Sequence, residues 1–106
     1  MKNMNKISKI KRDEIASIVN NKDVTKYFSS IKVFGSSITD HCSNKSDIDL
    51  FVTLKPKYMN DKDENDSYIV LLLASKSDKD IFFAHEQNGE FNPVLYKNMV
   101  NGIEVL

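Results

Sequence analysis

Residues 33–36 of this chain read Val-Phe-Gly-Ser, and residues 46–52 read Ser-Asp-Ile-Asp-Leu-Phe-Val. From the second stretch onward, apolar side chains occupy every other position: Ile48, Leu50, Val52 and Leu54. A period of two is typical of a strand with one buried face, so we expect a strand from Asp47 to Leu54. The first stretch ends a short run rich in β-branched residues and predicts another strand from Ile31 to Phe34.

Two carboxylates at the start of the longer strand are candidate metal ligands. Asp47 and Asp49 are two positions apart, so both side chains leave the same face, with backbones about 7 Å apart. Carboxylates held side by side repel each other unless a cation lies between them or one is protonated. Their oxygens suit Mg²⁺ or Mn²⁺. Asp80 opens a later apolar run and is expected at the same end of the sheet, with Asp78 as the alternative. Ordinary acidic residues at strand ends are the simpler interpretation.

The Gly35-Ser36 pair is a candidate phosphate contact. Glycine has no Cβ, so the backbone can come close to a ligand at this point. The Ser36 hydroxyl and nearby N–H groups can donate to phosphate oxygens, and a helix beginning here would add favourable partial charge. Gly-Ser is also a common turn dipeptide, so the pair does not decide the function alone.

The rest of the chain predicts alternating helices and strands. Apolar residues at helical spacing predict a first helix from about Asn5 to Asn20. Another helix begins at Asn92, which caps it ahead of Pro93, and Gly102 suits its left-handed end. The other expected elements are a polar segment over Ser36–Ser46, a mobile loop over Lys57–Asp66, a buried helix over Tyr68–Ser75, a strand over Asp80–Ala84 and an edge strand over Ile103–Leu106. This order indicates an α/β (α+β) fold with one small mixed sheet and helices packed on it.

The composition fits one globular domain over residues 1–106, with 41% apolar and 28% charged residues. Basic and acidic side chains number 15 each, and the net charge of zero argues against nucleic acid as the main ligand. The lysines near the N-terminus, including Lys11, are expected to be solvated. A single cysteine, Cys42, excludes an intrachain disulfide. Since no apolar run suits a signal peptide or a membrane span, we expect a cytoplasmic protein without membrane contact.

Together, these stretches resemble the signature of the polymerase-β-type nucleotidyltransferases, which is apolar-Gly-Ser, a spacer of about ten residues, and Asp-apolar-Asp. Gly35-Ser36 and Asp47-Ile48-Asp49 match it, and a serine directly before the first aspartate, here Ser46, is also typical. The chain further resembles the minimal nucleotidyltransferases (MNT), which are of similar length. Their third carboxylate corresponds to Asp80, and their final proline-containing helix and short strand correspond to residues 92–106.

The resemblance implies a polymerase-β-like fold and metal-dependent transfer of a nucleoside monophosphate from a triphosphate, with ATP as the expected donor. The ligands of Mg²⁺ or Mn²⁺ would be Asp47, Asp49 and Asp80. The nucleotide would be bound by Gly35, Ser36 and Ser46. Minimal members often act as the antitoxin of a toxin–antitoxin pair with a HEPN-type partner, and some transfer AMP to a tyrosine of that partner. Such a partner, or self-association as a homo-oligomer, is expected to complete the site.

The chain departs from the minimal members after Gly-Ser. Many of them continue with x-Ala-Arg-Gly, whereas this chain has Ser37-Ile38-Thr39-Asp40 and lacks the arginine. This difference keeps two other interpretations open: a catalytically weak binding module that neutralises a partner by complex formation, or a subunit of a small-molecule (antibiotic) nucleotidyltransferase. Phe34-Gly35-Ser36-Ser37 also resembles a group of poly(A) polymerases, which need a second domain to hold base and acceptor.

Overall fold

A four-stranded sheet forms the centre of the computed structural model, which describes all residues from Met1 to Leu106. The strands are β1 (Phe28–Phe34), β2 (Ile48–Leu54), β3 (Lys79–Phe83) and β4 (Ile103–Glu104), in the order β3-β2-β1-β4. β2 and β3 run parallel, whereas β1 is antiparallel to both β2 and β4. The predicted single mixed sheet is therefore confirmed, and the short linker between β1 and β2 joins antiparallel strands.

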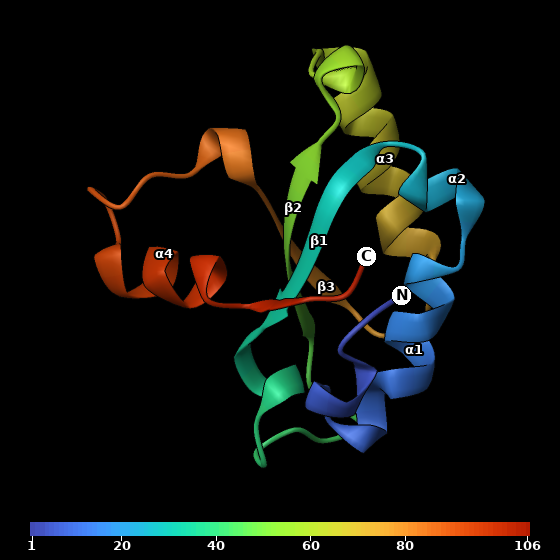
Figure 1. Cartoon of the computed structure of the whole chain (residues 1–106), viewed down its shortest axis with the longest axis vertical. Coiled ribbons are helices and arrows are strands. Elements are labelled where there is room, and N and C mark those ends of the chain that lie inside the picture. Colours follow the sequence, from blue (N-terminus) through green and yellow to red (C-terminus); the bar gives the residue numbers. More distant parts are fainter.

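Helices lie on both sides of this sheet. The α-helices are α1 (Lys9–Val19), α2 (Lys22–Thr25), α3 (Asp61–Leu73) and α4 (Pro93–Val100). The 3₁₀ helices are η1 (Met4–Lys6), η2 (Gly35–Ile38), η3 (Pro56–Tyr58) and η4 (Ala84–Glu86). Figure 1 shows α1, α2 and α3 on one side of the sheet and α4 alone on the other. None of these helices combines the length and the apolar character needed to cross a membrane.

The two faces of the sheet have different surroundings. Sixteen buried residues form the main core, in which the sheet packs against α1, α2 and α3. It includes the four apolar residues predicted to line one face of β2, none of which is exposed: Ile48, Leu50, Val52 and Leu54. On the other face, Phe34, Phe51 and Met99 form a smaller cluster that joins α4 to β1 and β2. The second face is thus covered only where α4 reaches it.

The first helix begins later than predicted. α1 begins at Lys9 rather than Asn5, because Ile7 is extended (φ −92°, ψ 141°) and the Ser8 N–H donates to the Ser37 carbonyl at 2.8 Å. Ile7 is buried although it lies outside the helix, so its position in the helical spacing of apolar residues wrongly predicted a helical residue. Lys11 is also a correction, because it is only 1% exposed and not solvated as predicted.

The segment predicted as a mobile loop over Lys57–Asp66 instead forms η3 and the first turns of α3. The Asn60 side chain accepts a hydrogen bond from the Asp63 N–H at 2.9 Å and caps the helix. Acidic side chains in the first turn then favour helix formation through the helix dipole. The acidic run is therefore the start of a helix.

The second half of α3 is less buried than predicted. Only Ser67 and Leu71 of this helix are buried, and Leu73 is 79% exposed. Of the apolar run from Tyr68, only Leu71 therefore belongs to the main core. The buried Lys79 Nζ lies past the C-terminus of the helix. It donates to the main-chain carbonyls of Leu72, Ser75 and Ser77 at 2.9–3.2 Å.

The last helix begins as predicted but ends differently. The Asn92 side chain accepts from the Leu95 N–H at 3.0 Å, and proline follows at the first helical position. Gly102 is not left-handed, because Gly35 is the only glycine with positive φ. A Cβ at Gly102 would lie 2.9 Å from the Val33 carbonyl oxygen, so this glycine permits close packing of the α4 end against β1. The strand that follows is shorter than the predicted Ile103–Leu106.

Candidate active site

Asp49 and Asp80 lie side by side on the partly covered face of the sheet. The parallel register of β2 and β3 pairs Asp49 with Asp80 and Phe51 with Phe82. Since side chains alternate along a strand, the two carboxylates share the face of Phe51 and point away from the main core. The competing candidate, Asp78, lies before β3, and its main-chain carbonyl accepts from the Ile48 N–H at 2.9 Å.

Asp47 lies at the edge of this pair. It directly precedes β2 and is exposed, and its charge is the smallest of the effects that raise the pKa of Asp49. The oxygens of the three carboxylates do not all lie within 4.8 Å of one another. The structure therefore brings Asp49 and Asp80 into contact and leaves Asp47 beside them.

The surroundings of Asp49 disfavour its charged form. Burial, a hydrogen bond to Asp80 and the charges of Asp80 and Asp47 raise its pKa from 3.8 to about 6. Each of these effects favours the protonated form, so the site favours a neutralising proton or a cation. Adjacent carboxylate oxygens with no nitrogen or sulfur donor fit a hard divalent ion, Mg²⁺ or Mn²⁺.

Gly35 is the point of closest approach between β1 and this carboxylate. Its φ is +73°, and a Cβ built there would lie only 2.0 Å from Asp49 Oδ2. Any side chain at position 35 would displace the carboxylate and force a left-handed backbone that other residues adopt at a cost. The glycine predicted to admit a phosphate thus also makes room for Asp49, and its nucleotide contact stays a prediction.

The serines of the signature lie in two turns next to the carboxylates. Ser36 is half-buried in η2, and its main-chain carbonyl accepts from the N–H of Thr39 at 3.0 Å. Ser46 Oγ accepts from the Ser43 N–H at 2.9 Å, which closes the turn before Asp47. Ser46 therefore supports the loop that carries Asp47, while binding of nucleotide by either serine remains a prediction.

A buried polar network holds the loops that precede both carboxylate strands. Lys11 Nζ donates to Ser77 Oγ at 2.8 Å and to the Asn44 carbonyl at 3.3 Å. The N–H and hydroxyl of Ser77 both donate to the Glu14 carboxylate. Burial alone would raise the pKa of Glu14, but these hydrogen bonds lower it to about 2. Apart from the helical face that Lys11 and Glu14 share, nothing in the sequence indicates this network.

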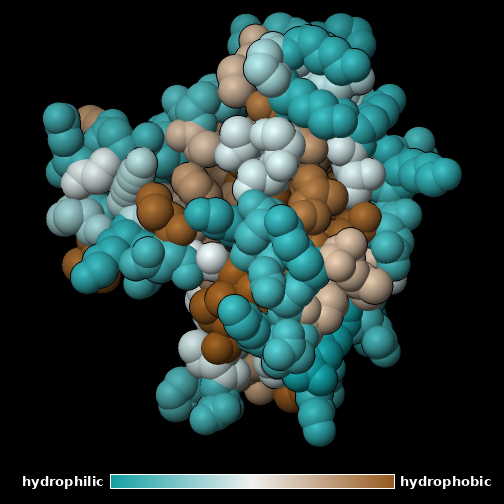
Figure 2. Space-filling view, viewed as in Figure 1, coloured by the Kyte–Doolittle hydropathy of each residue, from teal (hydrophilic) through white to brown (hydrophobic).

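A hollow of about 330 Å³ adjoins the Gly-Ser turn on the side of α4. Its lining residues are Phe34, Gly35, Ile38, Thr39, Asn98 and Asn101. In Figure 2 the surface is indented between the α4 lobe and the part of the molecule below it. No basic side chain lines this hollow, in agreement with the missing arginine after Gly-Ser. It offers polar groups and an aromatic wall next to the carboxylates.

Fold and site together define the class of protein. A small mixed sheet, paired carboxylates on neighbouring strands and a Gly-Ser turn against them are the features of the polymerase-β-type nucleotidyltransferases. Residues 2–90 match the family described as the central palm domain of mitochondrial-like poly(A) RNA polymerase, and the chain belongs to this family. The match stops before α4. A comparison with curated proteins found no relative. Membership supports a general nucleotidyltransferase role.

Proposed function

We propose that this chain transfers AMP from ATP to an acceptor hydroxyl, with pyrophosphate as the leaving group. The observation that carries the proposal is the pairing of Asp49 with Asp80, together with the close approach of Asp49 to Gly35. Asp47, Asp49 and Asp80 would hold Mg²⁺ or Mn²⁺, which supplies charge neutralisation for the triphosphate. The adjacent carboxylate oxygens of Asp49 and Asp80 fit that role.

The remaining residues of the site would position the nucleotide. The main chain around Gly35 and Ser36 would contact phosphate oxygens, and the turn closed by Ser46 would keep Asp47 in place. Aligning the acceptor oxygen with the α-phosphate lowers the barrier through orientation and electrostatics, without a covalent intermediate. The adjoining hollow itself offers no basic side chain to the triphosphate, since no lysine or arginine lines it.

The acceptor that we favour from the sequence resemblance is a hydroxyl on a HEPN-type protein partner, in a toxin–antitoxin pair. A second candidate is the 3′ hydroxyl of RNA, because the matching family is named for a poly(A) RNA polymerase. The two acceptors can be separated with ATP labelled on its α-phosphate, Mg²⁺, and either the partner encoded by the neighbouring gene or a short RNA. Label on the protein favours the first acceptor, and an RNA lengthened by adenylates favours the second.

The double substitution Asp47→Asn and Asp49→Asn tests catalysis itself. We expect it to abolish label transfer to any acceptor, because it removes two of the three carboxylates. Ser17→Ala, on the exposed side of α1, is the matched control and should leave transfer unchanged. If the wild-type chain labels no acceptor, and neutralisation of the partner survives the double substitution, the chain acts as a binding module and the enzymatic proposal is wrong.

A further inference from the structure

A second cluster of metal-binding side chains lies away from the proposed catalytic site. Glu64 belongs to α3, and His85 and Glu86 belong to η4, directly after β3. His85 Nε2 lies 2.5 Å from Glu64 Oε1 and 3.7 Å from Glu86 Oε1. Only these three residues in the whole chain have ligand atoms that all lie within 4.8 Å of one another.

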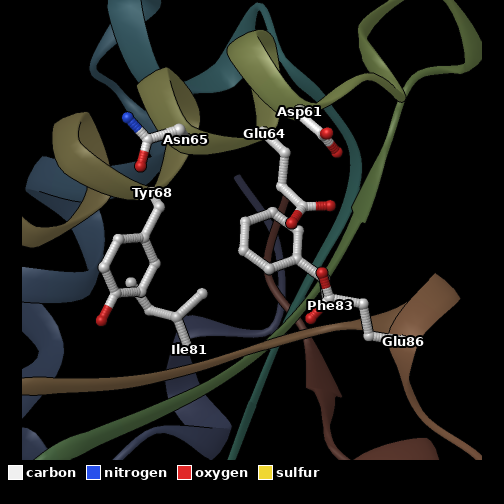
Figure 3. A pocket seen from close by; sticks show the side chains of 7 residues that line it. All are labelled: Asp61, Glu64, Asn65, Tyr68, Ile81, Phe83 and Glu86. Atoms are coloured by element: carbon white, nitrogen blue, oxygen red, sulfur yellow. The ribbon is translucent and has the colours of Figure 1, made fainter.

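The cluster borders an acidic hollow of about 380 Å³ between α3 and β3. Figure 3 shows Glu64 extending from α3 toward Glu86, with the Phe83 ring beside them and Asp61 above, while Ile81 lies farther along the hollow next to Tyr68. None of the seven lining residues is basic. Even with His85 protonated, the surrounding carboxylates give the hollow a net negative charge.

Packing and a helix cap support the cluster. The His85 ring packs edge-on against the buried Phe83 ring, with centroids 5.8 Å apart. Glu64 lies on a helix whose first turn is capped by Asn60. The cluster is also separate from the proposed catalytic carboxylates, because Asp80 lies near the start of β3 and His85 lies two residues past its end. The strand between Asp80 and Phe83 alone spans roughly 10 Å.

We propose that Glu64, His85 and Glu86 form a second metal site that binds a divalent transition ion of the zinc class. One imidazole nitrogen with two carboxylates suits Zn²⁺, whereas Mg²⁺ prefers oxygen ligands alone. Three protein ligands leave a fourth position for water. Ligand atoms around tetrahedral Zn²⁺ lie about 3.3 Å apart, so Glu64 has to move back from His85 by less than 1 Å. The bound ion would tie the start of α3 to the segment after β3.

The test is calorimetric titration of the metal-stripped full chain with Zn²⁺ in the presence of excess Mg²⁺. We expect one Zn²⁺ site that remains in the double variant Asp49→Asn, Asp80→Asn. We also expect His85→Ala to weaken Zn²⁺ binding at least tenfold. His41→Ala is the matched control because His41 is the only other histidine and has no acidic partner. Circular dichroism of each variant checks that it is folded.

The proposal also predicts that Zn²⁺ perturbs the NMR signals of the His85 ring in the wild-type chain, which needs no variant. Zinc affinity that is unchanged in His85→Ala would overturn the proposal and leave a hydrogen-bonded ion cluster. Binding that is lost only in the Asp49, Asp80 variant would also overturn it, because the ion would then occupy the catalytic carboxylates. None of these readouts depends on nucleotidyl transfer, so failure here leaves the proposed function untouched.

Discussion

Substitution of Asp49 by asparagine should stabilise the metal-free protein while it abolishes nucleotidyl transfer. In the folded chain, burial and the neighbouring Asp80 raise the pKa of Asp49 from 3.8 to about 6. A carboxyl group with a raised pKa contributes most to stability below pH 3.8, and this contribution is lost as the pH rises through about 6. The full shift corresponds to about 3 kcal/mol. Because Asp49 is partly exposed, solvent screening reduces this to an expected gain of roughly 1–2 kcal/mol for the variant at pH 8.

Urea unfolding in EDTA, followed by circular dichroism at pH 4 and pH 8, measures this difference. We expect the variant to have a higher free energy of unfolding than the wild type at pH 8. This difference should narrow markedly at pH 4, where wild-type Asp49 is protonated. Asp47→Asn removes the same charge from an exposed position, so its free energy of unfolding should rise much less. Saturating Mg²⁺ should stabilise the wild type more than the Asp49 variant. A gap of equal size at both pH values, or a less stable variant at pH 8, would refute the electrostatic reasoning.

Three other substitutions test the surrounding structure. Gly35→Ala should abolish nucleotidyl transfer, and its left-handed backbone alone should cost about 1–2 kcal/mol of stability. Gly89→Ala is the control, because its Cβ would meet only ordinary contacts at 3.9 Å, and it should leave both transfer and urea unfolding nearly unchanged. Glu14→Gln should lower the free energy of unfolding by at most about 3 kcal/mol at pH 7. Because the pKa of Glu14 is lowered from 4.5 to about 2, this loss should shrink as the pH falls through that range. A loss that does not depend on pH would contradict the role of the network. Lys79→Met leaves three carbonyls past the end of α3 without their donor, so urea unfolding should show a loss of about 1–3 kcal/mol; an unchanged midpoint would rule out this capping role.

The sequence predicts correctly those parts of the fold that depend on neighbouring residues. The alternation along β2 places Ile48 and Leu50 in the core, and the Asn92 cap marks the start of α4, because both effects act within a few residues. The contact of Asp49 with Asp80 depends on strand order and register. It followed only from the expectation that both strands begin at the same end of the sheet.

Two of the errors of prediction have tertiary causes. Ile7 leaves the helix because Ser8 bonds to Ser37 across the molecule, which no local window of sequence reveals. Lys11 is buried because partners from two distant loops surround its ammonium group. The cluster around His85 likewise joins residues that are distant in the sequence, because its partner Glu64 lies on another element. Sequence spacing cannot report contacts of this kind.

The parallel pairing of β2 with β3 makes the candidate site a late product of folding. The chain between Asp49 and Asp80 contains all of α3, so the carboxylates meet only after this long loop has closed at an entropic cost. A slip of β3 by one residue would turn Asp80 to the opposite face and dissolve the pair. Under the proposed function, affinity for the catalytic ion would therefore report completed assembly of the sheet, and ion binding would in turn select molecules with the correct register.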